Sequence, residues 1–157
     1  MSQAAIADEI ENKIGRLIEI WTSVVRDDPR IESDAALSKP ELIDHVPAII
    51  QEICTLIRKN KVPDVRSSHE ARANVYIRYQ QGYKGRDLIR ELSLLRITLL
   101  DHLKEISEDK EAACDSEEVH NASKILNLYL DEEMRYAISV YGSAPSAPET
   151  PEARASG

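Results

Sequence analysis

Residues 88–100 read LIRELSLLRITLL, the most apolar stretch of the chain. Apolar side chains recur at helical spacing through this stretch and beyond it: Leu88, Ile89, Leu92, Leu94, Leu95, Leu99, Leu100, Leu103 and Ile106. A stripe this broad predicts a helix that is buried on more than one side. We therefore expect this segment to form the central helix of an all-α domain.

The composition supports one helical domain. A chain of 157 residues with 42% apolar residues can build a packed core of useful size. With one Trp, six Tyr and no Phe, the core must consist mainly of Leu, Ile, Val and Ala. Good helix formers are abundant and only five residues are Gly, which favours helix over sheet.

The first two helical segments lie at the start of the chain. The first carries one apolar stripe, made of Ile6, Ile10, Ile14, Leu17, Ile18, Trp21, Val24 and Val25. It should end at Asp27-Asp28-Pro29, since the residue before a proline resists the α conformation. The second begins at a capping box formed by Ser38 and Glu41. Pro47 should break or kink it before a longer helix over residues 49–57, which Asn60-Lys61-Val62-Pro63 closes.

Two further helices complete the expected bundle. One starts at a capping box of Ser67 and Glu70 and stops at Gly82. The last follows a polar run and carries its apolar stripe from Val119 to Tyr141. The sequence therefore predicts a single bundle of five to six helices over residues 4–141, with a Pro-kinked second helix. Residues 142–157, rich in Pro, Ala and Ser, should be a disordered tail or linker.

Charge and hydropathy exclude several classes of partner. The net charge of −8 argues against nucleic acid, because phosphate binding needs clustered Lys and Arg. The N-terminus lacks the pattern of a signal peptide, and no stretch is apolar enough to cross a membrane. Cys54 and Cys114 are far apart and are interpreted as reduced thiols, with a disulfide between them as the alternative. We expect a soluble, cytoplasmic protein with no membrane insertion.

No motif indicates catalysis, a cofactor or a metal. The chain has no phosphate-binding glycine loop, and its four histidines are not paired at ligand spacing on one helix. Cys54 lies in an amphipathic helix and is interpreted as a small core residue rather than a nucleophile. A haem pocket is disfavoured because a chain without Phe offers little aromatic wall to a porphyrin. We expect no enzyme activity, no cofactor and no metal site.

Charged residues inside the apolar region are the remaining candidates. Arg78 precedes Gly82, while Glu91 and Arg96 flank a run of leucines. If such a charge faces the core it needs a partner, because an unpaired buried charge is costly. Two interpretations stay open, a structural ion pair that fixes helix register and a signal-sensitive polar contact. Trp21 and Tyr83 are candidate packing residues.

Two stretches resemble a known family. Residues 42–50, LIDHVPAII, resemble the L-x-D-x-[LV]-P-x-[LI]-[LI] stretch of the RsbRD-type N-terminal domain. Residues 78–83, RYQQGY, followed by residues 87–96, DLIRELSLLR, resemble its second motif. Members often carry a His four residues before the Arg of this motif, where this chain has Asn74. The resemblance covers most of residues 15–141.

The resemblance implies a function. Domains of this family occur in co-antagonists of the stress-response switch kinase RsbT and at the front of bacterial sensor histidine kinases. It thus implies a non-catalytic, all-helical input domain for signal transduction, coupled to a protein partner or a covalently linked output domain and compatible with a homodimer. Two alternatives stay open: a standalone helical adaptor that binds a partner protein, and a small-molecule or cofactor sensor.

Overall fold

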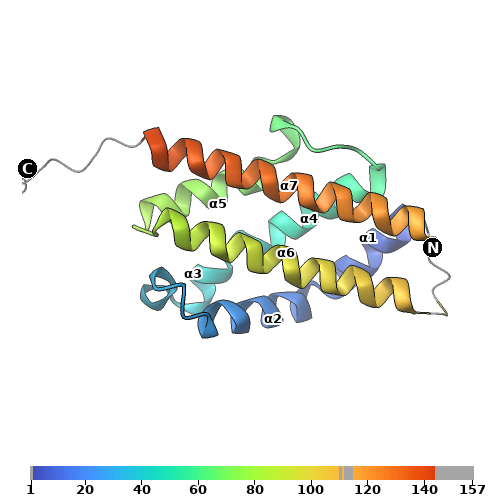
Figure 1. The fold of residues 1–157 in the computed structure, drawn as a ribbon, viewed down its shortest axis with the longest axis horizontal. Helices are drawn as coiled ribbons and strands as arrows, with labels where there is room; N and C mark the ends of the chain where they lie inside the picture. Colours follow the sequence, from blue (N-terminus) through green and yellow to red (C-terminus); the bar gives the residue numbers. More distant parts are fainter. Residues whose placement is uncertain (1, 110, 112–114, 144–157) are drawn as a thin grey trace, which may run out of the picture.

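The computed structural model describes residues 2–109, 111 and 115–143. These residues form helices and no strand, so the predicted all-α bundle is confirmed (Figure 1). The α-helices are α1 (Gln3–Asn12), α2 (Ile14–Asp27), α3 (Lys39–Ile43), α4 (Val46–Lys59), α5 (His69–Gln80), α6 (Gly85–Glu108) and α7 (Ser116–Ser143). Two short 3-10 helices, η1 (Ser33–Ala36) and η2 (Val65–Ser67), lie in the connections.

Helix α6 is central, as its sequence predicts. It lies between α2 and α7 and contacts both, while α4 packs against α1 and α5 against α7 (Figure 1). Its buried apolar side chains occupy several sides of the helix: Leu88, Leu92, Leu94, Leu95, Leu99, Leu103 and Ile106. The start of α1 and the end of α7 lie at opposite ends of the bundle (Figure 1).

The first apolar stripe forms two helices rather than one. The expected continuous helix breaks at Lys13, whose N–H bonds to carbonyls of the preceding turn. Beyond the break, α2 packs on α6, whereas α1 packs on α4. A straight helix could not reach both partners, and Gly15 lowers the helix propensity beside the break. The expectation of one helix is therefore wrong.

The predicted break at the proline is confirmed. Ser38 and Glu41 form both halves of a capping box at the start of α3. Helix α3 ends at Ile43, and α4 starts two residues after Asp44 with Pro47 in its first turn. A proline is tolerated there because the first helical N–H groups have no partner inside the helix.

Helix α5 starts within the predicted stretch, at His69, but the predicted capping box of Ser67 and Glu70 is wrong. Ser67 caps η2 with Asp64 instead of pairing with Glu70. The N–H of Glu70 donates to the carboxylate of Glu52 on α4 at 2.9 Å, so a tertiary contact replaces the local cap. Helix α5 ends as expected, since Gly82 adopts a φ of +74°, a conformation that favours glycine.

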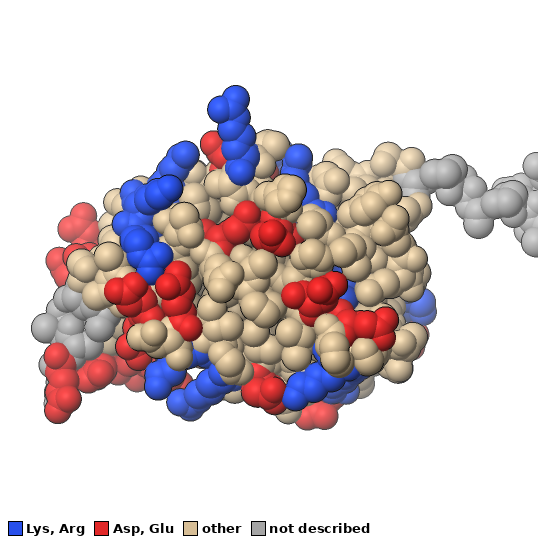
Figure 2. All heavy atoms as spheres, turned by 180° about the vertical axis from the view of Figure 1, so that it is seen from behind, with Lys and Arg blue, Asp and Glu red and all other residues tan. Residues whose placement is uncertain are grey.

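The surface opposite the view of Figure 1 is mixed in charge. Figure 2 shows Lys, Arg, Asp and Glu side chains interspersed over the described residues of this face, with no single field of one sign. Of the expected tail, Gly142 and Ser143 complete α7, and residues 144–157 lie outside the described residues.

Candidate functional site

A buried ion pair joins the end of α5 to the start of α6. Nη2 and Nε of Arg78 lie 3.0 and 3.2 Å from Oε1 of Glu91, and both side chains are 1% exposed. A buried pair stabilises a fold only when its other hydrogen-bonding groups are also satisfied. The surroundings of these two residues meet that condition.

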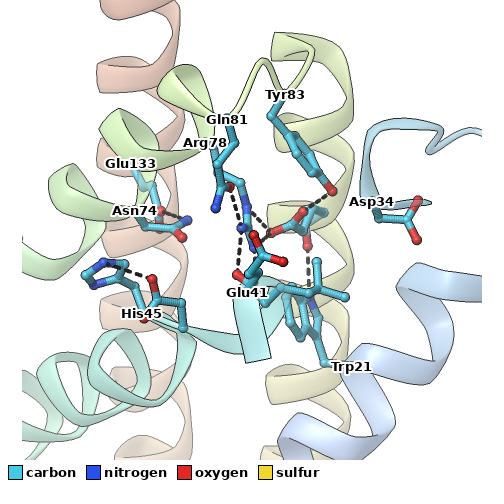
Figure 3. A network of polar contacts seen from close by, with 12 residues as sticks. Trp21, Asp34, Glu41, His45, Asn74, Arg78, Gln81, Tyr83 and Glu133 are labelled. Carbon is cyan, nitrogen blue, oxygen red and sulfur yellow. Dashed lines mark hydrogen bonds and ion pairs between the residues drawn. The ribbon is translucent and has the colours of Figure 1, made fainter. Parts of the chain in front are cut away.

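The carboxylate and backbone of Glu91 are satisfied by two aromatic residues. The hydroxyl of Tyr83, from the turn between α5 and α6, donates to Oε2 of Glu91, and its ring lies 5.0 Å from the guanidinium of Arg78. The indole N–H of Trp21 on α2 donates to the backbone carbonyl of Glu91 at 3.2 Å. Trp21 and Tyr83 therefore pack against the ion pair, as Figure 3 shows.

Arg78 also closes the end of α3. Its Nη2 donates to the carbonyl of Leu42 at 2.6 Å, and its Nη1 to the carbonyl of Glu41 and to the side chain of Gln81 at 3.2 Å (Figure 3). The last carbonyls of a helix have no partner within it. The planar guanidinium, with five N–H donors, can serve these carbonyls and the carboxylate together.

We call Trp21, Arg78, Tyr83 and Glu91 the central polar cluster. It connects α2, α3, α5 and α6 through the carboxylate and backbone carbonyl of Glu91 and the guanidinium of Arg78. Burial raises the pKa of Glu91, and the charge of Arg78 and the Tyr83 hydroxyl oppose that shift. Burial and the nearby Glu91 charge raise the pKa of Tyr83, which keeps its hydroxyl protonated as the donor.

Arg96 does not join this cluster. Its Nη2 lies 2.5 Å from Oδ1 of Asp131 and 3.9 Å from the sulfur of Met134, both on α7. Its side chain is partly exposed. Arg96 and Glu91 therefore make separate contacts, to α7 and α5 respectively.

A second buried carboxylate lies on α7 and was missed by the sequence analysis. Glu133 is 1% exposed and accepts one hydrogen bond from the side-chain amide of Asn74, at 3.0 Å (Figure 3). Burial raises the pKa of Glu133 to about 8. Its position four residues after Tyr129 and four before Ala137, in the apolar stripe of the last helix, was an available signal.

A third set of contacts joins α4, α5 and α7. The hydroxyl of Tyr129 donates to Oε1 of Glu52, which also accepts the N–H of Glu70. Nδ1 of His45 lies 3.2 Å from Oε2 of Glu70 (Figure 3). These contacts link α7 to α4 through Tyr129 and Glu52, and α4 to α5 through Glu52 and Glu70. They also link α5 to His45, in the break that precedes Pro47.

The described residues offer little to a metal or to covalent chemistry. They contain no group of three or more His, Cys, Asp or Glu side chains placed to bind a metal ion. Burial raises the pKa of the Cys54 thiol to about 12, which disfavours the reactive thiolate. Among these residues, no helix has the length and apolar character needed to span a membrane.

The described residues form a helical domain with a buried ion pair between α5 and α6. A family model described as the RsbT co-antagonist protein rsbRD N-terminal domain matches residues 15–146. The chain belongs to this family, and a co-antagonist domain is regulatory. No curated protein and no solved structure matches the chain.

Proposed function

We propose that this chain is a non-catalytic input domain of a bacterial signalling protein of the stress-response or histidine kinase type, working in the cytoplasm. It acts through contacts with a partner protein or a linked output domain, and a homodimer is part of this proposal. Residues 4–141 form the regulatory unit, and residues 142–157 serve as its tail or linker. The family match supports the regulatory class.

The observation that carries the proposal is the central polar cluster. The Glu91 carboxylate accepts hydrogen bonds from Arg78 on α5 and from Tyr83 in the turn that follows it. The backbone carbonyl of Glu91 accepts a further hydrogen bond from Trp21 on α2. A rigid displacement of α2 or α5 relative to α6, or of α3 relative to α5, would therefore break a hydrogen bond of the cluster. A buried polar group without its partner is costly. Such an arrangement favours a few discrete packings over continuous deformation, which suits a domain that transmits a signal by helix rearrangement.

The first test changes one contact while keeping the fold. Tyr83→Phe removes the hydroxyl that donates to Glu91 but keeps the ring beside Arg78. We expect the variant, in the native protein in its source cell, to shift the output of a stress-response reporter at normal protein abundance. Tyr76→Phe is the matched control, since Tyr76 lies on α5 and is 52% exposed. Equal output from both variants and the wild type would contradict a signalling role for the cluster.

A second test identifies the output. The intact mass of the native protein in its source cell is compared with the 17.7 kDa of this chain. A larger product would place an output domain on the same chain and support the input-domain proposal. A product of this size would mean that the output belongs to a separate protein, as in a standalone adaptor.

A further inference from the structure

An exposed apolar groove runs between α2 and α6, away from the central polar cluster. Its floor is formed by the buried Leu17 and Leu94, and its volume is about 230 Å³. Ile20 and Ile97 on its rims are 41% and 50% exposed. Figure 1 shows α2 at the edge of the bundle, beside the central α6, and Val24 in the same groove is also exposed, at 38%.

Charges at the two ends of α2 have opposite signs. Lys13 and Arg16 line the groove at the start of α2, and Asp27 lines its continuation at the end of the helix. Lys13 and Asp27 each lie seven residues, about two helical turns, from Ile20, so the three share one stripe. None of these three charged side chains forms an ion pair among the described residues.

Helix α6 repeats this arrangement. It runs antiparallel to α2, with Arg90 lining the groove beside Asp27 and Glu105 lining it beside Lys13. Each helix is thus basic toward its start and acidic toward its end along the groove. When a second copy of this surface is rotated by a two-fold axis that reverses the direction of the helices, its acidic residues face the basic residues of the first copy.

We propose that the groove is the contact surface of a homodimer, in which a second copy of the chain packs its own α2–α6 face on the first. The two-fold axis lies in the interface and passes by Ile20, so that α2 crosses α2 of the second copy antiparallel. Lys13 of each copy then faces Asp27 of the other. Glu105, which lies 3.5 Å from His102 of its own chain, faces Arg90, whose Nε also bonds to Asp28 of its own chain at 2.8 Å. An interface that uses the same patch on both copies needs this self-complementarity, and an apolar centre with a charged rim is typical of homodimers.

The inference extends the homodimer included in the proposed function and names its surface. The test is the mass of the full 157-residue chain in solution, measured by sedimentation equilibrium at low salt. We expect about twice the 17.7 kDa of one chain. Ile20→Glu should weaken the dimer at least tenfold, because it places a charge at the centre of an apolar contact. Ile138→Glu, at a 67% exposed position on α7, is the control and should leave the dimer unchanged.

A charge exchange tests the orientation. Lys13→Glu and Asp27→Lys should each weaken the dimer, since each brings two like charges together. The variant carrying both substitutions should dimerise like the wild type, because the opposed charges are restored with their signs exchanged. All four substituted positions named for these tests are exposed or lie at the groove, which keeps the fold intact.

A monomeric wild type, or a dimer that Ile20→Glu leaves intact, would overturn the interface. Failure of the double variant to recover dimerisation would overturn the antiparallel arrangement of α2 on α2. Neither result touches the regulatory role, because the Tyr83→Phe reporter assay does not depend on the mass of the chain. An intact dimer without the Tyr83→Phe reporter effect would, conversely, contradict the regulatory role of the cluster and leave the dimer interface in place.

Discussion

The side-chain amide of Asn74 on α5 donates a hydrogen bond of 3.0 Å to Oε1 of Glu133 on α7, while Oε2 of Glu133 lacks a partner among the described residues. A fully buried carboxylate with one neutral donor is poorly solvated when ionised. The packing of α5 on α7 therefore contains a group whose protonated form suits the fold better than its charged form.

This arrangement predicts a pH-dependent stability. Because the pKa of Glu133 rises from 4.5 to about 8 on folding, the folded state holds the proton more tightly between these values. The stability linked to this group is therefore full below pH 4.5 and is lost as the pH rises to about 8. Relative to Glu133→Gln, the wild type should lose on the order of 2–4 kcal/mol of unfolding free energy between pH 5 and pH 8.

Urea unfolding at a series of pH values measures this difference. Glu132→Gln on the same helix is the matched control and should keep the wild-type pH dependence, since Glu132 pairs with Arg135 at the surface. Parallel pH profiles for the wild type and Glu133→Gln would show that Glu133 does not titrate in this range.

Removing the charge of Glu91 should lower the stability of the fold strongly. Glu91→Gln leaves the buried guanidinium of Arg78 without a counter-charge, and breaking a buried pair in this way typically lowers the unfolding free energy by about 3–5 kcal/mol. Urea unfolding gives the value. Glu19→Gln, which removes an exposed ion pair with Lys39, should leave the midpoint nearly unchanged. Similar midpoints for both variants would mean that water reaches Arg78.

Trp21 should report on the same cluster. It is the single Trp of the chain, is 1% exposed, and should emit at short wavelength in the folded state and shift to the red on unfolding. Trp21→Phe removes the donor to the Glu91 carbonyl and part of the packed ring, which should lower the unfolding free energy by about 1–3 kcal/mol. Thermal unfolding followed by circular dichroism tests the loss, and an unchanged melting temperature would rule out this contribution.

Cys54 should be unreactive until the domain unfolds. Its side chain is fully buried, and burial raises its pKa to about 12, so little thiolate is present at neutral pH. In a Cys114→Ser variant, a thiol-reactive dye should label Cys54 slowly in buffer and rapidly in concentrated urea. Fast labelling of the folded protein would indicate that α1 opens from α4, since these two helices pack together.

The sequence predicted those features of the fold that depend on interactions between residues close together in the chain. The break near Pro47, the capping box of Ser38 and Glu41, and the stop at Gly82 each depend on residues within one turn, and each is present. The central position of α6 also followed from its own broad stripe.

Features that depend on distant residues were not predicted. The break at Lys13 reflects the need of α1 and α2 to pack on different helices, which no local pattern shows. The N–H of Glu70 is taken by Glu52, a residue of another helix. The sequence drew attention to Arg78 and Glu91, but their pairing, and the separate partner of Arg96, required the three-dimensional arrangement.

The proline break and the buried arginine are two halves of one feature. Helix α3 stops before Pro47, which leaves the carbonyls of Glu41 and Leu42 without helical donors, and Arg78 supplies those donors. If a substitution of Pro47 let α3 continue into α4, the carbonyls of Glu41 and Leu42 would bond within the helix and no longer accept from Arg78. If Arg78 were lost, these two carbonyls would lack the donors that it supplies. We therefore expect a substitution at one of these positions to be tolerated better when the other position changes with it.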